Sequence, residues 1–285
     1  MNIKQIQQSV FLRLSSFLGE GEARAVVRLL LKHVTGYDNL YINLNPQTAV
    51  GASVIDSMNI AVGQLLENKP IQYVLGETVF CGLFFRVTDA VFIPRPETEE
   101  LIYWILEENK PATKLLDICT GSGCIAVSLA KNINGCEVSA VEISDEALKI
   151  AEKNAELNEV KINFMQYDIL NPDFLCSMNT KFDVIVSNPP YVREMEKRDM
   201  HKRVLDYEPP TALFVKDENP LLFYHTILQF GQTHLTNNGK LYVEINEHFG
   251  KEITALFLTY GYRNISLKQD LHGKDRMVCG GMVEE

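Results

Sequence analysis

A short run of residues in the middle of the chain has types and an order that suit one kind of chemistry. An apolar stretch, predicted to be a buried strand over residues 182–187, runs directly into Asn188, Pro189, Pro190 and Tyr191. The Asn188 side-chain oxygen and the Pro189 carbonyl can each accept a hydrogen bond, and proline adds no competing N–H donor. Together they can hold both N–H bonds of a planar NH2 group on which Tyr191 packs. We infer N-methylation of such a group, which leaves glutamine, adenine and guanine open as substrates.

A second segment has the residue types of a cofactor site. Residues 115–124 read LLDICTGSGC, which predicts an apolar strand, a glycine-rich turn and the start of a helix. Glycines allow a tight turn and a close approach of the backbone to a ligand, and the helix N-terminus offers free N–H groups. Glu142 follows Gly121 by 21 residues, at the end of the next predicted strand, where an acidic side chain binds a ribose diol. The two segments indicate an adenosine-containing cofactor.

The identity of that cofactor depends on the residues before the first glycine. Gly121-x-Gly123-x-x-Ala126 matches the dinucleotide fingerprint, but that fingerprint has its first glycine directly after the strand, where this chain has Cys119. Asp117 at the strand end fits S-adenosylmethionine better, because a carboxylate attracts its sulfonium and amino groups and no pyrophosphate needs a site. A plain strand-to-helix turn, with glycines used for packing, is the alternative without a ligand. We predict S-adenosylmethionine and no metal.

The elements that must position these segments are predicted by hydrophobic periodicity. From about residue 97, helical and strand patterns alternate. The predicted strands are 114–118, 138–142, 162–166, 182–187 and 240–245, and the predicted helices are 97–109, 124–131, 145–157, 218–234 and 248–258. Such alternation is typical of an α/β domain with a parallel sheet and helices on both faces, whose ligands bind at the carboxyl ends of the strands. The two segments should therefore meet at one sheet edge.

The first part of the chain differs from this pattern. Apolar residues recur there at helical spacing, and no strand is predicted before residue 70. Segments 72–75, 78–80 and 83–87 are rich in β-branched and aromatic residues, which predicts a short β-hairpin connector. We predict three parts: a helical domain at 1–70, a hairpin connector at 71–96 and the α/β domain at 97–285.

Composition limits the classes of partner. The chain has 285 residues and a formal net charge of −10. Its first 75 residues hold 6 basic and 5 acidic residues, so the remainder carries −11. Nucleic-acid binding relies on a basic surface, so an acidic catalytic half disfavours it. No apolar run approaches the roughly 18 residues of a membrane span and no secretory signal is apparent, so we expect a cytoplasmic protein.

Four motifs together resemble the HemK family, the release factor glutamine methyltransferases. The motifs are IPRPETE at 93–99, DICTGSG at 117–123, NPPY at 188–191 and YEPPTAL at 207–213. NPPY is shared with nucleic-acid methyltransferases, whereas IPRPET is specific to this family. The resemblance spans essentially the whole chain. It implies a Rossmann-like class I S-adenosylmethionine-dependent methyltransferase domain and a small N-terminal helical domain that helps dock the partner.

The resemblance also implies the reaction and the roles of single residues. The methyl group would pass to N5 of the glutamine in the Gly-Gly-Gln motif of class I peptide chain release factors, leaving S-adenosylhomocysteine. Glu142 would bind the ribose, and Asp168 and Ile169 would border the adenine. The catalytic residues would be Asn188, Pro189 and Tyr191, joined in the glutamine pocket by Pro190. The cofactor residues would be Asp117, Cys119, Thr120, Gly121, Ser122, Gly123, Glu142, Asp168, Ile169 and Asn188.

Three of these positions depart from the family's usual pattern. Cys119 stands where glycine is usual, which predicts a backbone conformation there that a side chain readily allows. Glu142 stands in place of a common aspartate, and Ile169 in place of an aromatic residue at the adenine edge. None lies in the NPPY segment at 188–191, which we call the methyl-accepting motif, so these changes bear on cofactor affinity rather than on the type of reaction.

Two other functions remain open at this point. The same chemistry on an exocyclic amine of DNA or RNA is disfavoured by the acidic catalytic half and by the lack of a basic target-recognition domain. A binding module without catalysis is disfavoured by the complete motif set. A basic cluster after Tyr191 is either a solvated face or a surface for an acidic or RNA-like partner; it consists of Lys197, Arg198, Lys202 and Arg203. We expect a monomer.

Overall fold

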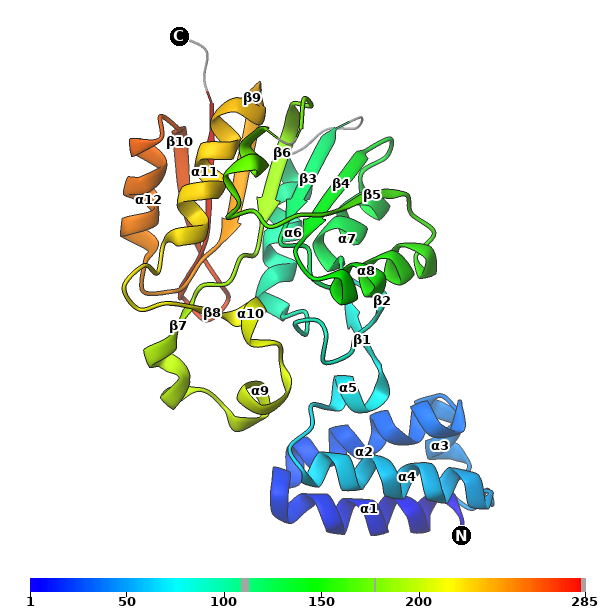
Figure 1. Cartoon of the computed structure of the whole chain (residues 1–285). Coiled ribbons are helices and arrows are strands. Elements are labelled where there is room, and N and C mark those ends of the chain that lie inside the picture. The colour runs from blue at the N-terminus through cyan, green and yellow to red at the C-terminus, as the bar shows by residue number, and fades with distance from the viewer. Residues whose placement is uncertain (109–112, 177, 283–285) are drawn as a thin grey trace. The chain divides into compact units, whose positions relative to one another are not determined.

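The computed structural model describes residues 1–108, 113–176 and 178–282, which form two compact units (Figure 1). The first unit contains Met1–Gly76 and His201–Tyr207, and the second contains the described residues of Glu77–Met200 and Glu208–Glu285. The domain boundaries predicted at residues 70 and 96 stay predictions. Residue 109 of the predicted helix 97–109 and the last three residues of the predicted domain 97–285 lie outside the described residues.

The first unit is helical. Its elements are α1 (Ile3–Leu18), α2 (Glu20–Thr35), α3 (Asn39–Leu44), α4 (Ala52–Leu66), α5 (Ile71–Leu75) and α9 (Lys202–Tyr207). The apolar face of α1 recurs at three- and four-residue spacing and is buried against α2 and α4. The sequence predicts extended backbone at 72–75, but these residues form α5, which ends at Gly76 in the left-handed conformation (φ +71°). Pattern alone misjudges this segment because a single helical turn is too short to show its period.

The short helix α9 belongs to the helical unit although its sequence lies far along the chain. The Arg203 guanidinium pairs with Glu22 of α2 at 2.9 Å, and the Tyr207 hydroxyl donates to the Glu67 carbonyl at 2.8 Å. Of the predicted basic cluster, Arg203 is therefore bound within this unit. Lys197 and Arg198 pair with the acidic residues Glu194 and Asp199 beside them in the chain.

The second unit is built on a seven-stranded sheet with the strand order β10-β11-β9-β6-β3-β4-β5. Five strands are parallel: β3 (Lys114–Ile118), β4 (Glu137–Glu142), β5 (Ile162–Gln166), β6 (Phe182–Ser187) and β9 (Leu235–Glu244). The sequence predicts a purely parallel sheet and misses two strands, β10 (Arg263–Gln269) and β11 (Asp275–Gly281). β11 runs antiparallel to both of its neighbours. β10 is an exposed edge strand, so it lacks the apolar run by which the other strands are detected.

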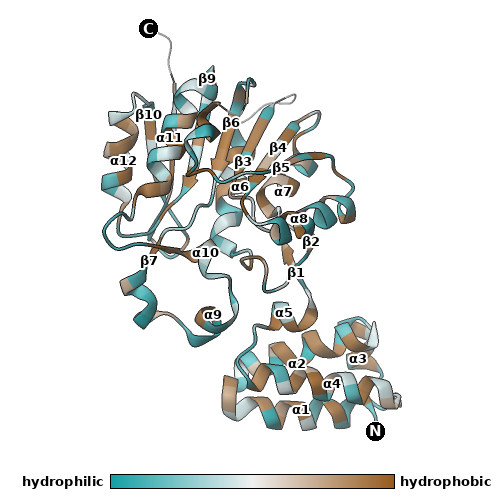
Figure 2. Cartoon of the chain, in the orientation of Figure 1, coloured by the Kyte–Doolittle hydropathy of each residue, from teal (hydrophilic) through white to brown (hydrophobic). Residues whose placement is uncertain are grey.

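Helices cover both faces of this sheet (Figures 1 and 2). They are α6 (Pro96–Glu108), α7 (Cys124–Asn132), α8 (Asp145–Leu157), α11 (Leu222–His234) and α12 (Gly250–Thr259). Successive residues of β3 face opposite sides: Leu115 packs in the core with α6 and α7, whereas Leu116 packs in the core with α11 and α12. Figure 2 shows the central strands as strongly hydrophobic, as expected for strands buried on both faces.

Shorter elements complete the second unit. The predicted hairpin is confirmed, with β1 (Glu77–Phe80) antiparallel to β2 (Leu83–Arg86). The remaining elements are η1 (Pro172–Cys176), β7 (Val192–Arg193), η2 (Glu194–Asp199), α10 (Pro210–Leu213) and β8 (Phe214–Val215). Within the described parts of the chain, no helix is both long and apolar enough to cross a membrane.

A buried asparagine on α8 connects the hairpin to the glycine-rich turn. Asn154 Oδ1 accepts the Arg86 N–H at 2.7 Å, and its Nδ2 donates to the carbonyls of Arg86 at 3.0 Å and Ser122 at 2.8 Å. Its side chain is fully buried. All the hydrogen-bonding groups of this amide are thus satisfied by backbone, which holds the turn in place.

Replacement of this asparagine tests how much the turn depends on it. Asn154→Ala removes the partner of the buried Ser122 carbonyl and of the partly buried Arg86 backbone groups, so it should lower the free energy of unfolding by about 1 to 3 kcal/mol. Urea denaturation of the full chain measures this, with Asn163→Ala, at an exposed position of β5, as the matched control. Equal midpoints for the two variants would show that the connection contributes no stability.

Candidate active site

The glycine-rich turn follows β3, and a buried carboxylate holds it to the next helix. Asp117 is fully buried. Its Oδ2 accepts a hydrogen bond from the Thr120 hydroxyl and another, at 3.1 Å, from the Ala126 N–H in the first turn of α7. One carboxylate oxygen therefore fixes both ends of the turn.

The turn needs unusual backbone conformations at three positions. Gly121 and Gly123 have φ angles of +55° and +78°, and a Cβ on Gly123 would lie 3.1 Å from the Ala151 side chain of α8. Cys119 also has a positive φ, of +62°. The sequence predicts a backbone region that a side chain allows, and the structure places Cys119 in the left-handed region, which residues with a side chain adopt only rarely. The chain has to bend sharply out of β3 at this point, at a cost of roughly 1 to 2 kcal/mol for a residue with a side chain.

The second oxygen of Asp117 is available to a cation. Oδ1 is buried and has no hydrogen-bond partner among the described residues. Burial raises the pKa of Asp117 to about 7, with a further contribution from the nearby Glu142 charge, against the hydrogen bonds from Thr120 and Ala126. A positively charged group next to Oδ1 would stabilise the ionised form. The residues present therefore fit a cationic cofactor such as S-adenosylmethionine.

The predicted ribose residue lies beside this turn. Glu142 ends β4, the neighbour of β3, and its Oε2 accepts the Gly121 N–H at 2.9 Å. Its Oε1 accepts the N–H groups of Ile143 at 2.9 Å and Ser144 at 3.1 Å. The carboxylate is thus held at the sheet edge by backbone donors. Its role toward a ribose stays a prediction.

The predicted adenine residues follow β5, next to β4. Asp168 is exposed, and its Oδ1 accepts the Leu170 N–H at 2.9 Å. Ile169 is buried in the same core as α11 and α12. The Tyr167 N–H donates to the Glu142 carbonyl at 2.9 Å, so this loop starts from the same sheet edge. Whether these residues border an adenine stays a prediction.

The methyl-accepting motif follows β6, on the other side of β3. Asn188 is half-buried, and its Nδ2 donates to the Thr98 hydroxyl at 3.3 Å. The Thr98 hydroxyl in turn donates to Glu244 Oε2 at 2.7 Å, and the Tyr191 hydroxyl donates to Glu244 Oε1 at 2.9 Å. Pro189, which lies between Asn188 and Tyr191 in the sequence, is buried. One carboxylate at the end of β9 therefore connects to both ends of the motif.

Burial and nearby charges shift the pKa values of Glu244 and of its neighbour Tyr191. Burial raises the pKa of Glu244, while the hydrogen bonds from Thr98 and Tyr191 and the charge of Arg276 act in the opposite direction. Burial first, and then the Glu244 charge, raise the pKa of Tyr191 well above its ordinary value. The Tyr191 hydroxyl therefore keeps its proton and acts as a donor, which excludes it as a general base.

Two further motifs meet in the same unit. The Arg95 guanidinium pairs with the buried carboxylate of Glu208, whose Oε2 also accepts the Ile93 N–H at 3.3 Å. Arg95 also lies over the Phe92 ring, 4.6 Å from its centroid. The IPRPETE and YEPPTAL segments are thus joined by a charge-assisted contact, although they are distant in sequence.

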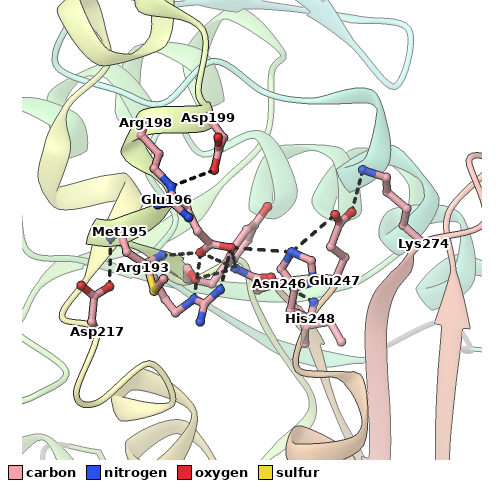
Figure 3. A network of polar contacts seen from close by, with 12 residues as sticks. Arg193, Met195, Glu196, Arg198, Asp199, Asp217, Asn246, Glu247, His248 and Lys274 are labelled. Atoms are coloured by element: carbon pink, nitrogen blue, oxygen red, sulfur yellow. Dashed lines mark hydrogen bonds and ion pairs between the residues drawn. The ribbon is translucent and has the colours of Figure 1, made fainter.

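A cavity of about 460 Å³ opens beside the methyl-accepting motif. Figure 3 shows the polar network that lines part of it. Asn246 Nδ2 donates to the Tyr191 carbonyl at 3.2 Å and to Glu196 Oε2 at 3.0 Å, and Glu196 also accepts the Arg193 N–H at 2.7 Å. Asn246 thus ties the loop after Tyr191 to the end of β9.

The structure brings most of the predicted site residues together. The segments 117–123, Glu142 and Asn188 follow the adjacent strands β3, β4 and β6. Sequence reasoning missed Thr98, Glu244 and Asn246. Thr98 lies within the IPRPETE segment, which was a usable signal, whereas Glu244 and Asn246 stand at no fixed spacing from a motif that would mark them.

Comparison with known proteins first defines the class. Residues 98–268 match the model of the methyltransferase small domain, and residues 9–76 match that of the PrmC N-terminal domain. The methyltransferase from Pyrococcus furiosus, at 19% identity, aligns with a TM-score of 0.54 over 78% of this chain and 98% of that one, which shows a shared fold. The second unit is a Rossmann-like methyltransferase domain, as predicted, and this class implies the use of S-adenosylmethionine.

Relatives over the whole length define the family. The chain is 45% identical over 283 residues to the release factor glutamine methyltransferase of Flavobacterium psychrophilum, covering 98% of both proteins. It is 43% identical over 257 residues to that of Bacteroides thetaiotaomicron, covering 90% of this chain and 92% of the relative. The chain belongs to the release factor glutamine methyltransferase family, and the resemblance inferred from its motifs is confirmed.

The buried carboxylate of Asp117 predicts a pH dependence of cofactor binding. Below about pH 7 the carboxyl gains a proton and loses its attraction for a cation, so affinity should fall with pH. One proton with this pKa weakens binding about tenfold between pH 8 and pH 6. Calorimetric titration with S-adenosylmethionine measures it, with Asp117→Asn as the variant that lacks the titrating group. The same pH profile in both proteins would rule out Asp117 as its source.

Proposed function

We propose that this protein transfers the methyl group of S-adenosylmethionine to the side-chain N5 of the glutamine in the Gly-Gly-Gln motif of class I peptide chain release factors. Membership in the family supports the substrate. The observation that carries the proposal is the position of Asn188 and Pro189 after the end of β6, directly beside the strand β3, whose glycine-rich turn we propose as the cofactor site. Amide and methyl donor would therefore meet at one sheet edge.

The chemistry explains the need for two acceptors. An amide nitrogen is a poor nucleophile because its lone pair is delocalised into the carbonyl. When bound, S-adenosylmethionine supplies a methyl group on a good leaving group. Asn188 Oδ1 and the Pro189 carbonyl accept the two N–H bonds of the glutamine amide, which holds its nitrogen in line with the methyl carbon. With the cofactor bound, the glutamine nitrogen would take the methyl group, S-adenosylhomocysteine would be the leaving group, and the nitrogen would release one proton to solvent.

The remaining site residues take supporting roles in this proposal. Asp117 Oδ1 faces the cationic part of the cofactor. The Glu142 carboxylate accepts hydrogen bonds from the ribose hydroxyls in place of one from a backbone N–H. Asp168 and Ile169 border the adenine. Further contacts come from the turn residues Cys119, Thr120, Gly121, Ser122 and Gly123. The glutamine pocket is completed by Pro190 and by Tyr191, whose ring is held by its hydroxyl on Glu244.

We also propose the setting in which the reaction takes place. The methyl donor is already activated, so the transfer requires no metal. The acidic catalytic half favours a protein substrate over nucleic acid, and the helical unit supplies a surface for docking the release factor. A monomer suffices for this arrangement, since both predicted ligand sites lie in one unit. A substrate of the translation machinery places the enzyme in the cytoplasm.

A methyl-transfer assay with three acceptors tests the function. The enzyme is incubated with labelled S-adenosylmethionine and a purified release factor, the same factor with its motif glutamine replaced, or bulk nucleic acid. Label should appear only on the intact factor. Label on nucleic acid alone would reject the proposal and favour methylation of an exocyclic amine.

Loss of the Asn188 acceptor should affect the reaction more than the cofactor. Asn188→Ala misplaces the reacting amide, so kcat should fall by roughly 100-fold or more. The dissociation constant of S-adenosylmethionine, measured by calorimetry, should change much less. Equal losses in rate and cofactor affinity would instead make Asn188 a cofactor residue.

A further inference from the structure

An asparagine that serves as an acceptor faces an orientation problem. Its side-chain amide has an oxygen on one side and an NH2 group on the other, with nearly the same shape. If the Asn188 amide turned over, Nδ2 would face the NH2 group of the substrate, and two donors would oppose each other. The proposed function therefore requires a device that sets which side of Asn188 faces the substrate.

Thr98 and Glu244 form a chain of hydrogen bonds with one direction. A threonine hydroxyl has a single proton, and the Thr98 hydroxyl gives it to Glu244 Oε2 at 2.7 Å. Toward Asn188 the Thr98 oxygen can then only accept, and it does so from Nδ2 at 3.3 Å. Both Glu244 oxygens accept, one from Thr98 and one from Tyr191, so the carboxyl group sets the direction of the whole chain. Thr98 and Glu244 are both 1% exposed, which keeps competing water away.

We propose that Thr98 and Glu244 are positioning residues, which hold the Asn188 side-chain amide with Oδ1 toward the glutamine of the substrate. This assignment rests on the proposed function, because it assumes that Asn188 accepts from the substrate amide. Neither residue needs to touch the substrate. Both act through Asn188.

The other neighbours of Glu244 keep the direction unique. The Tyr191 hydroxyl donates to Oε1 at 2.9 Å, and the Arg276 guanidinium, which has donors only, lies close to that hydroxyl. The Tyr191 proton therefore has to go to Glu244. The Tyr224 hydroxyl donates to the Glu244 backbone carbonyl at 3.0 Å and does not compete for the carboxylate.

Removal of the Thr98 hydroxyl tests the assignment. Thr98→Val keeps the shape of the side chain but releases Asn188, so kcat for a release factor should fall about 10- to 100-fold. The KM for the factor and the dissociation constant of S-adenosylmethionine should stay within about threefold, and Thr98→Ser should restore kcat. Thr236→Val is the matched control, since this partly buried hydroxyl donates to Asp183 Oδ1 at 3.0 Å at the opposite end of β9.

A second variant decides the question if Thr98→Val does not fold. In Glu244→Gln the amide oxygen must still accept from Tyr191, so the new NH2 group faces Thr98. The Thr98 proton is then free to donate to Asn188 Oδ1, which favours the turned-over amide. We expect kcat to fall at least about tenfold, again with KM and cofactor affinity retained.

The outcomes separate this proposal from the proposed function. A wild-type enzyme that does not methylate the release factor rejects both. Methylation by the wild type, with kcat unchanged in Thr98→Val and Glu244→Gln, overturns the positioning role alone. A loss confined to cofactor affinity or KM would also overturn it, because orientation of the reacting amide affects kcat.

Discussion

The cost of burying a carboxylate without hydrogen-bond donors governs the architecture of this site. Asp117 and Glu244 are both removed from solvent, at the ends of β3 and β9. A buried carboxylate needs hydrogen-bond donors, and where they are incomplete its pKa rises, as it does for Asp117. Asp117 therefore accepts hydrogen bonds from Thr120 and from the first turn of α7, which fix the glycine-rich turn. Glu244 accepts hydrogen bonds from Thr98 and Tyr191, and the second of these fixes one end of the methyl-accepting motif.

The same rule explains why widely separated segments meet here. The buried Glu208 carboxylate pairs with Arg95 and accepts the Ile93 N–H. These contacts join the YEPPTAL and IPRPETE segments. Thr98, a few residues after Arg95, then lies within reach of Asn188. Asn154 serves the cofactor turn in the same way from α8. Each motif of the family is thus held by a polar contact to another motif or to a neighbouring element.

The helical unit includes a short segment from a later part of the chain. The segment between the methyl-accepting motif and YEPPTAL contributes α9 to this unit, where Arg203 and Tyr207 bind it to α2 and to the end of α4. The loop after Tyr191 is therefore continuous with a helix of the proposed docking unit.

Much of the fold could be predicted from local pattern. The strands at 114–118, 162–166 and 182–187 and the helix at 145–157 have the predicted bounds, since buried strands and amphipathic helices show their periods in sequence. The edge strand β10 and the single turn α5 could not be predicted, because one is exposed and the other is shorter than its own period. The motifs were sufficient to indicate the cofactor and the family.

The sequence by itself thus determined the alternation of helices and parallel strands, the glycine turn, the methyl-accepting motif and the family. Only the tertiary structure decided that Cys119 adopts a left-handed backbone, and that Asn188, Thr98 and Glu244 form a chain of hydrogen bonds. The reason is physical. Periodicity and motif spacing are properties of neighbouring residues, whereas the donors that satisfy a buried carboxylate are chosen by which strands lie next to each other in the sheet.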